Sequence, residues 1–388
     1  MADILILGGS GIISKEVTSI AISFGHNVTI VNRGRRKKFI HPEAKLIVAD
    51  LRNDSIYDIK SKISQSYDAI IDVISYNPNE LERNLSIAKN KCKQYFLFST
   101  SVVYKTKEGR YSEDDEIGNK DWEYSIKKIE CERLLQEKAE EYGFYWTIVR
   151  PYITYGETRI PLQFGPIEYY TVVNRAKFGK PIPLFEKTTK CTLTYSKDFA
   201  EGLVGLIDNP NAFNQVFHIT GSFETTWKAT LESVMNAFQI PYSVVNLSEK
   251  QFRDKRLMRG LDANEVYGDK GRDMLFINDK IKHAVPSFVG DTEFDKVLPD
   301  IVCYFSNTEN QRINYAWDAR VDCMLAKSGL LTRTQKKWLT FSPGVNATSR
   351  DRFVYYMNRY DITYFLLRVF LKVKLLSRMK RTNLMNKH

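Results

Sequence analysis

Two residues with the chemistry of an acid/base pair, Tyr124 and Lys128, stand four positions apart in a stretch that reads as a long helix. This spacing puts both side chains on one face of the helix, one turn apart. A free tyrosine titrates near ~10, which is too high for efficient proton transfer at neutral pH. A neighbouring ammonium favours the phenolate and lowers that pKa. The pair therefore predicts a tyrosine that exchanges a proton with a substrate.

Further polar residues follow the predicted strands on either side of this helix. Residues 99–101, Ser-Thr-Ser, end a buried strand with hydroxyl groups that could hold a substrate oxygen. Glu132 follows Lys128 at another four-residue step, and the next strand ends in Arg-Pro-Tyr-Ile-Thr-Tyr-Gly at residues 150–156. These segments are the candidates for the rest of a catalytic site.

A glycine-rich turn, residues 8–11, follows the first predicted strand and opens the first helix. In that context Gly8 permits the sharp turn, and Gly11 lets the backbone approach a pyrophosphate at the helix N-terminus. Ser14 stands where such turns usually carry a third glycine. The alternative is a glycine turn without a ligand. The expected dinucleotide contacts here are Gly8, Ser10, Gly11, Ile12 and Ile13.

The end of the second predicted strand bears on the choice of dinucleotide. Enzymes that use NAD place a carboxylate there for the ribose hydroxyls, whereas this chain has Asn32 and Arg33, followed by further cations up to Lys38. The planar guanidinium of Arg33 suits a 2′-phosphate. NADP is therefore expected over NAD, with a solvated basic loop as the alternative reading. After the third strand, Asp50 and Leu51 are placed to contact the adenine ring.

The elements that would position these residues alternate along the chain. Continuous apolar runs at 4–7, 28–31, 46–49, 69–73, 95–98 and 146–149 are separated by helical stretches. Such runs are typical of parallel strands buried on both faces. The pattern predicts an α/β fold with a Rossmann-type, doubly wound parallel sheet. Residues 1–156 would form the dinucleotide-binding part, 157–305 a smaller substrate-binding part interleaved with the sheet, and 306–388 a basic, mostly helical extension.

The net charge of +11 is located in this C-terminal extension. Residues 306–388 contain 16 Lys/Arg and 5 Asp/Glu, so residues 1–305 are neutral. A basic, aromatic amphipathic helix expected over Asp361–Lys380 suits the inner face of the cytoplasmic membrane, and packing on the body or on a neighbouring subunit is the alternative. The five scattered cysteines lack metal-ligand or disulfide spacing and no secretory signal is apparent, so a reducing cytoplasm and no metal are expected.

In their order, the motifs Gly-x-x-Gly, Ser-Thr-x-x-Val-Tyr, Tyr-x-x-x-Lys-x-x-x-Glu and Arg-Pro-x-x-x-Tyr-Gly resemble the NAD-dependent epimerase/dehydratase family, the extended short-chain dehydrogenases. The resemblance covers residues 1–305. It implies that Tyr124 is the acid/base, that Lys128 orients the cofactor ribose, and that Thr100 binds the reacting oxygen, with Ser101 in its place if the alignment shifts by one. The cofactor contacts that it implies further along the chain are Ser75, Lys128, Pro151 and Ile153.

The resemblance implies a nucleotide-sugar substrate and hydride transfer at a sugar carbon. Family members that form 4-keto-6-deoxy sugars carry Asp-Glu after the catalytic threonine, where this chain has Ser101-Val102, so 4,6-dehydration is disfavoured. An epimerase and a keto-sugar reductase both remain open: the basic loop at Arg33 favours reduction, and the family as a whole favours epimerisation. Lys190-Cys191 departs from the arginine that often contacts the nucleotide diphosphate, and His218, in a buried-strand pattern, is expected to be structural.

The partners expected from the sequence are a nucleotide sugar and a second copy of the chain in a homodimer, with no specific nucleic acid. If the extension binds lipid, the enzyme would serve a membrane-bound glycan assembly line. Two other classes are weighed against this reading. One is a cofactor-sensing or RNA-binding Rossmann protein, which the basic extension allows but which has no need of Tyr124 and Lys128. The other is a dehydrogenase of a small lipid or steroid.

Overall fold

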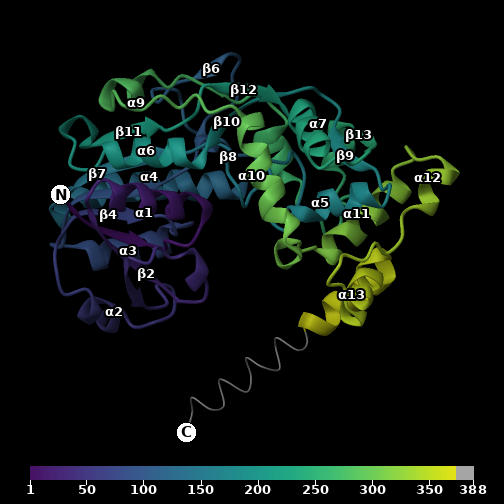
Figure 1. The fold of residues 1–388 in the computed structure, drawn as a ribbon, viewed down its shortest axis with the longest axis horizontal. Coiled ribbons are helices and arrows are strands. Elements are labelled where there is room, and N and C mark those ends of the chain that lie inside the picture. Colours follow the sequence, from purple (N-terminus) through teal and green to yellow (C-terminus); the bar gives the residue numbers. More distant parts are fainter. Residues whose placement is uncertain (373–388) are drawn as a thin grey trace, which may run out of the picture. The chain divides into compact units, whose positions relative to one another are not determined.

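The computed structural model describes residues 1–372 of the 388-residue chain, which divides into two compact units (Figure 1). Both units are assembled from separated stretches of sequence. Unit 1 comprises Met1–Pro161, Thr189–Thr230 and Tyr267–Ile301, and unit 2 comprises Leu162–Thr188, Leu231–Val266 and the chain from Val302 onward. The boundary predicted at residue 305 lies close to the one between Ile301 and Val302, and the C-terminal extension joins Leu162–Thr188 and Leu231–Val266 in unit 2.

Unit 1 is built on a seven-stranded sheet in the order β11-β7-β5-β4-β1-β2-β3, with every neighbouring pair parallel. The predicted doubly wound parallel sheet is confirmed. Chain order reverses between β1 and β4, and ligands of such sheets bind at the carboxyl ends of the strands beside this point. The strands are β1 (Asp3–Leu7), β2 (Asn27–Asn32), β3 (Lys45–Val48), β4 (Tyr67–Asp72), β5 (Cys92–Phe98), β7 (Tyr145–Arg150) and β11 (Gln215–His218).

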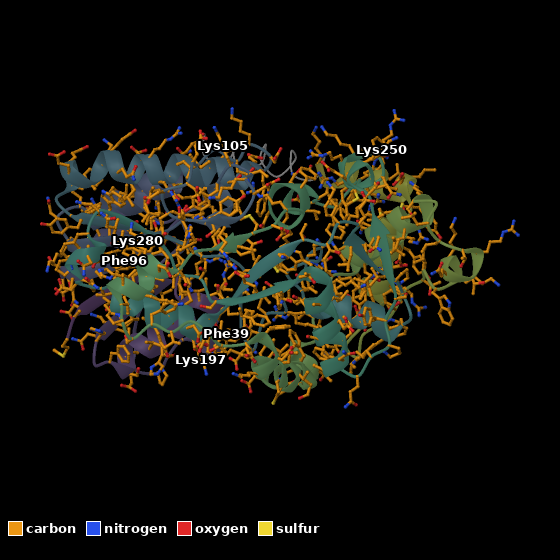
Figure 2. The ribbon with its side chains drawn as sticks, turned by 90° about the horizontal axis from the view of Figure 1, so that it is seen from above. Phe39, Phe96, Lys105, Lys197, Lys250 and Lys280 are labelled. Atoms are coloured by element: carbon orange, nitrogen blue, oxygen red, sulfur yellow. The ribbon has the colours of Figure 1, made fainter. Side chains whose placement is uncertain are left out.

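Helices cover both faces of this sheet, which explains its continuous apolar strands. Along β1, Ile4 and Ile6 join one buried cluster, and Leu5 and Leu7 join the other. Phe96, labelled in Figure 2, lies in the first cluster. Helices α1 (Ile12–Ser23), α6 (Ser196–Gly205) and α9 (Asp279–Ala284) contribute to the first cluster, and α2 (Ile56–Lys62), α3 (Pro78–Ala88) and α4 (Glu123–Tyr142) to the second.

Smaller sheets of unit 1 hold the segments that leave the large sheet. One has the order β12-β10-β8, and the other pairs β14 with β6. Their bounds are β6 (Arg110–Tyr111), β8 (Thr154–Tyr155), β10 (Lys190–Tyr195), β12 (Phe223–Thr226) and β14 (Leu275–Phe276). Pairing of β8 with β10 fixes the stretch that follows β7, which contains several predicted site residues.

Unit 2 combines a parallel pair of short strands with helices. The strands are β9 (Ile182–Phe185) and β13 (Val244–Leu247). Two helices, α7 (Trp227–Ala237) and α10 (Phe294–Ser306), begin in unit 1 and end in unit 2. The other helices are α5 (Tyr170–Lys177), α8 (Glu249–Arg253), α11 (Tyr315–Lys327), α12 (Arg333–Lys337) and α13 (Ser349–Arg359), followed by a terminal helix at residues 361–372. Residues 373–380 of the helix expected over Asp361–Lys380 lie outside the described part of the chain.

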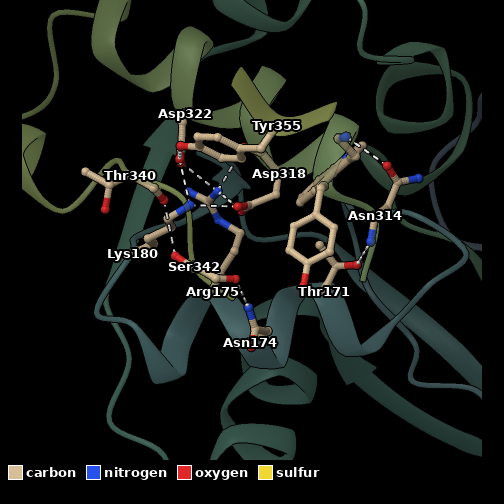
Figure 3. Close-up of polar contacts among 12 residues, drawn as sticks. Thr171, Asn174, Arg175, Lys180, Asn314, Asp318, Asp322, Thr340, Ser342 and Tyr355 are labelled. Carbon is tan, nitrogen blue, oxygen red and sulfur yellow. Dashed lines mark hydrogen bonds and ion pairs between the residues drawn. The ribbon is translucent and has the colours of Figure 1, made fainter. Parts of the chain in front are cut away.

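A buried ion network, which we call the anchor network, ties the C-terminal extension to the rest of unit 2 (Figure 3). Lys180 Nζ lies 2.6 Å from Asp318 Oδ2 and 2.7 Å from Asp322 Oδ2, and Arg175 contacts the same two carboxylates. The Tyr355 hydroxyl donates to Asp322. All five side chains are at most 2% exposed. The network joins the stretch around α5 to α11 and α13, so the extension is integral to the core of unit 2.

Candidate active site

The turn between β1 and α1 depends on two glycines with positive φ. Gly8 has a φ of 121° and Gly9 a φ of 89°. A Cβ on Gly8 would lie 2.5 Å from Val73 Cγ2, and one on Gly9 would lie 2.4 Å from Ile30 Cγ2. Neither position therefore admits a side chain. The sequence pattern predicts this role for Gly8, but the close packing of Gly9 against β2 is visible only in three dimensions.

The N-terminus of α1 carries unpaired donors at the turn. Gly11 is the N-cap, with an ordinary φ of −89°, and its N–H donates to Ser14 Oγ over 3.0 Å. The buried Ser14 thus turns its side chain back onto the cap, where a glycine would leave space. The N–H groups of Ile12 and Ile13 belong to the first helical turn, which has no intrahelical acceptors for them. Together with the half-buried Ser10, they can receive an anion.

The end of β2 holds its own loop together. Asn32 Nδ2 donates to the Gly8 carbonyl over 2.9 Å, and Asn32 Oδ1 accepts the Gly34 N–H over 2.7 Å. The side chain of Arg33 is exposed. Asn32, predicted to contact the cofactor, therefore braces the glycine turn with its side chain. Arg33 is the first of several exposed cations after this strand that a ligand can reach.

Asp50, at the end of β3, carries a negative charge near this cation. A hydrogen bond from Asn53 lowers the pKa of Asp50, and the N–H of Arg52 and the charge of Arg33 lower it further. The next residue, Leu51, is buried at 5% exposure. The residues predicted for the adenosine end are thus gathered around neighbouring strand ends.

Tyr124 and Thr100 come together in unit 1, while Ser101 points elsewhere. The Thr100 side chain lies close to the Tyr124 phenol and acts to lower its pKa. Ser101 Oγ instead donates to the Arg150 carbonyl over 2.8 Å and is fully buried. Val102, which follows, is also buried. Of the two hydroxyl residues considered for the reacting oxygen, Thr100 is the one beside the phenol.

Lys128 lies one turn along α4 on the same face as Tyr124. Its Nζ donates to the carbonyls of Ser75 and Phe98, over 2.6 Å each, and the side chain is 2% exposed. Nζ is 5.9 Å from the ring centre of Tyr124 and 5.0 Å from that of Tyr76. Ser75, predicted as a cofactor residue, therefore contributes its carbonyl to the placement of Lys128.

The protein's own groups raise the pKa of Tyr124 on balance, so the lowering that the spacing predicts requires a further contribution. Burial raises the pKa of the phenol and outweighs the lowering by Thr100. Burial likewise lowers the pKa of Lys128. The ammonium points at two carbonyls and lies 5.9 Å from the ring centre of Tyr124, so its attraction for a phenolate is smaller than the cost of desolvating that anion. A further positive charge is needed to form the phenolate.

A buried carboxylate, Asp72, fixes the loop that receives Lys128. It ends β4 and accepts from the Ser75 hydroxyl over 2.5 Å, from Asn84 Nδ2 over 3.0 Å and from the Tyr95 hydroxyl over 2.7 Å. The Ser75 N–H also donates to it. No role for Asp72 is predicted from the sequence. The feature that could have indicated one is a single carboxylate at the end of an apolar run.

Two of the sequence motifs meet in a buried scaffold. Arg150 Nη2 lies 2.7 Å from Glu132 Oε2, and Arg150 Nη1 donates to the Tyr104 hydroxyl over 2.6 Å. Tyr104 in turn contacts His218 Nε2. Burial, aided by the charge of Arg150, lowers the pKa of His218 to about 3, so this histidine is neutral and structural as expected. Glu132 and Arg150 hold α4 against the strand ends.

The stretch after β7 contains a strained residue at a predicted cofactor position. Ile153 has a φ of 27°, which is rare for a β-branched residue. Such strain persists only where the surroundings enforce it, and it is concentrated at functional sites. Pro151 accepts the Ser101 N–H over 3.0 Å. A Cβ on Gly156 would lie 2.6 Å from Ser196 Oγ, so this glycine allows the stretch to pass close to α6.

The cysteine considered near the substrate segment is inert. Cys191 is fully buried in β10, and burial raises the pKa of its thiol. Lys190 beside it is exposed. Among residues 1–372, no group of three or more His, Cys, Asp and Glu side chains is arranged to hold a metal ion.

Comparison with protein families identifies the class. The model of the NAD dependent epimerase/dehydratase family matches residues 4–220, and the chain belongs to this family. The matched region contains the glycine turn, Thr100, Tyr124, Lys128 and the stretch after β7.

Solved structures with a similar fold include sugar-nucleotide epimerases. UDP-glucuronic acid 4-epimerase from Bacillus cereus, in complex with UDP-glucuronic acid and NAD, has a TM-score of 0.62 at 15% identity, over 78% of this chain and 99% of that one. UDP-glucose 4-epimerase from Thermus thermophilus, in complex with NAD, has a TM-score of 0.61 at 14% identity, over 79% and 99%. An epimerase from Methanothermobacter thermautotrophicus has a TM-score of 0.65 at 14% identity, over 79% and 93%.

A relative in sequence has a different kind of name. The chloroplast stem-loop binding protein of 41 kDa b from Arabidopsis thaliana is 29% identical over 264 residues, which cover 64% of this chain and 67% of the relative. Proteins similar to this chain in fold or in sequence thus carry names for sugar epimerisation and for binding a stem-loop.

Proposed function

We propose that this protein is a sugar-nucleotide epimerase that uses a nicotinamide dinucleotide, with Tyr124 as the acid/base. The observation that carries the proposal is the association of the Tyr124 phenol with Thr100 while Lys128 is buried one turn away. The family and the printed names of the similar structures support a nucleotide sugar as substrate. A single reduction of a keto-sugar is the other reaction that the same residues can perform.

Each side chain has a defined task in this proposal. Thr100 holds the substrate oxygen by a hydrogen bond, and Tyr124 takes the hydroxyl proton when the carbon is oxidised and returns it on reduction. Lys128 uses two of its three N–H donors on carbonyls, so one remains for a ribose hydroxyl. Val102, where a dehydratase needs a carboxylate, cannot exchange a proton, which argues against elimination of water.

The residues at the strand ends fit a dinucleotide. Gly8 and Gly9 leave no side chain in the turn, and the first turn of α1 offers N–H groups to a pyrophosphate. When bound, an oxidised nicotinamide supplies two-electron redox chemistry and the positive charge that Tyr124 requires. The exposed Arg33 and the absence of a carboxylate from the end of β2 favour NADP over NAD. Tighter binding of NAD⁺ than of NADP⁺ to the purified protein would contradict this preference.

Substitution of the phenol tests the chemistry. Tyr124→Phe should reduce turnover by at least about a hundredfold, because the proton acceptor is lost, and should leave dinucleotide affinity nearly unchanged. Tyr57→Phe, at a tyrosine that is 80% exposed on α2, is the control and should retain full activity. Normal turnover of the Tyr124→Phe protein would exclude the acid/base assignment.

The purified protein distinguishes the two reactions. Oxidised cofactor that is retained through purification, identified by absorbance and mass, is expected for an epimerase, whereas a site that only added NADPH saturates indicates a reductase. A thermal-shift panel of nucleotide sugars tests the substrate class. Stabilisation by sterols alone would move the assignment to a lipid dehydrogenase.

A second candidate function follows from the relative named for stem-loop binding. A stem-loop is a folded nucleic-acid element, and the surplus of cations in residues 306–388 could contact its phosphates. Binding of a stem-loop RNA with a steep salt dependence, together with no turnover on any nucleotide sugar, would favour this function over the epimerase.

A further inference from the structure

The terminal helix at residues 361–372 presents an apolar stripe to solvent. Five large side chains recur at the i, i+3, i+4, i+7 and i+8 positions and therefore share one face. Their exposed fractions lie between 44% and 76%. A water-soluble surface rarely leaves so many neighbouring aliphatic and aromatic side chains uncovered. The members of this stripe are Ile362 at 76%, Phe365 at 62%, Leu366 at 56%, Val369 at 44% and Phe370 at 62%.

The opposite side of this helix is fixed to unit 2. The Tyr364 ring centre lies 4.6 Å from the guanidinium carbon of Arg320. Asp361, at the start of the helix, accepts from Arg320 Nη2 over 3.0 Å and is paired with Lys327. Arg320 is itself buried. These contacts set the rotation of the helix, so the exposure of the stripe follows from how the helix is attached.

The preceding helix, α13, has a similar composition on its open side. Phe353 and Tyr356, at i and i+3, are 61% and 44% exposed, and Tyr360, which follows the helix, is 55% exposed. Arg352 beside them is also exposed. Aromatic rings next to cationic side chains are the composition of helices that lie at the headgroup level of a bilayer.

The charge around the stripe is positive. Arg368 and Lys372, one turn apart on the terminal helix, are both exposed. The described part of the extension, residues 306–372, carries 11 Lys/Arg against 5 Asp/Glu. A binding partner that covers the stripe should therefore offer both an apolar region and negative charge. Among the described residues, no helix is long and apolar enough to cross a bilayer.

We propose that the stripe docks on an anionic lipid surface, with the terminal helix lying in the plane of the membrane. Its aliphatic members Ile362, Leu366 and Val369 enter the acyl boundary, while Arg368 and Lys372 contact the headgroups. Aliphatic side chains gain little from stacking on bases, so the composition favours lipid over nucleic acid. The positive charge, which two copies would bring together, favours lipid over a second copy of the chain.

Vesicle binding by the full-length protein tests the proposal. The protein should co-sediment with vesicles that contain about a third phosphatidylglycerol and should bind phosphatidylcholine vesicles at least about tenfold more weakly. Raising the salt concentration should weaken the anionic binding, because screening removes the headgroup attraction. Failure to bind anionic vesicles would overturn the proposal.

A matched pair of substitutions locates the binding surface. Ile362→Glu should lower the affinity for anionic vesicles at least about tenfold. Ile167→Glu, at an isoleucine of the same unit that is 80% exposed, should leave it unchanged. Because both side chains project into solvent, thermal unfolding should match the parent protein and so exclude a folding defect. Equal vesicle binding by the two variants would contradict a role for the stripe.

The same experiments distinguish two other binding partners of the stripe, a nucleic acid and a second copy of the chain. If Leu366→Glu abolishes binding of a stem-loop RNA while the parent protein ignores vesicles, the surface is a nucleic-acid site and the proposal fails. If Leu366→Glu converts a dimer to a monomer in light scattering, again without vesicle binding by the parent, a second copy covers the stripe and the proposal fails.

Discussion

Two of the deeply buried groups of charges in the described part of the chain differ in how their cations are matched. In the anchor network of unit 2, Arg175 and Lys180 face Asp318 and Asp322, so two cations meet two carboxylates. In unit 1, Lys128 is equally buried, but it donates to two backbone carbonyls. Within residues 1–372, no carboxylate lies at ion-pair distance from its ammonium.

The difference separates a structural use of charge from a chemical one. When carboxylates neutralise a buried cation, little of its positive potential is left to act on a ligand. Removal of one carboxylate then leaves a buried charge without compensation. A buried ammonium held by neutral carbonyls keeps its field and its third donor, at the cost of a pKa that burial lowers. The first arrangement fixes the extension of unit 2, and the second suits the reaction that we propose.

The largest effect is expected from opening the anchor network. Asp322→Ala leaves Lys180 and Arg175 sharing a single carboxylate in the interior, and should lower the free energy of unfolding by about 3–5 kcal/mol. Urea denaturation followed by circular dichroism measures this. Glu232→Ala, at an exposed carboxylate of the same unit, is the control and should change stability by less than about 0.5 kcal/mol. If the Asp322→Ala protein were as stable as the parent, the anchor network would not stabilise unit 2.

Lys128→Met should lower activity without lowering stability, the reverse of what is expected for Asp322→Ala. Loss of the ammonium should reduce kcat by about a hundredfold or more, since Tyr124 loses the cation that favours its phenolate. Stability should be unchanged or higher, because an apolar side chain of similar volume replaces an uncompensated buried charge. Steady-state kinetics and urea denaturation on the same preparation check both halves. A large loss of stability would place Lys128 with the structural cations.

A smaller, pH-dependent effect is expected at Asp361, where the terminal helix is attached. Partial burial alone raises its pKa, but hydrogen bonds from Lys327 and Arg320 outweigh burial and lower the pKa to about 2. A carboxylate with a lowered folded pKa stabilises above its unfolded value of 3.8, and this contribution is lost as the pH falls toward 2.

Asp361→Asn should therefore be less stable than the parent by on the order of 1 kcal/mol at pH 7, a value reduced by solvent screening. The difference should disappear between about pH 4 and pH 2. Urea midpoints measured across this range test the expectation. A difference that persists at pH 2 would mean that the effect is not ionic.

The sequence predicts the large sheet well and the buried polar contacts poorly. Strands covered on both faces contain continuous apolar runs, as at residues 4–7 in β1 and 69–71 in β4, so they can be recognised without tertiary knowledge. The helical spacing of Tyr124 and Lys128, together with the motifs around them, predicts that both side chains lie on one face of a helix, which the structure shows. In contrast, Arg175 and Asp318 are 143 positions apart, and in the sequence each resembles an ordinary surface charge. The pKa of Tyr124 also needed the structure, because burial decides its direction.

The interleaving of unit 2 determines when that unit can form as the chain is synthesised. Unit 1 includes Met1–Pro161, the first part of the chain to be synthesised. It can begin to fold early, because domains near the N-terminus fold first on the ribosome. Arg175 and Lys180, by contrast, cannot form their ion pairs until Asp318 and Asp322 have been synthesised, more than 130 residues later in the chain. A message truncated shortly before Asp318 would thus yield a protein in which the large sheet can form but the interior of unit 2 cannot close.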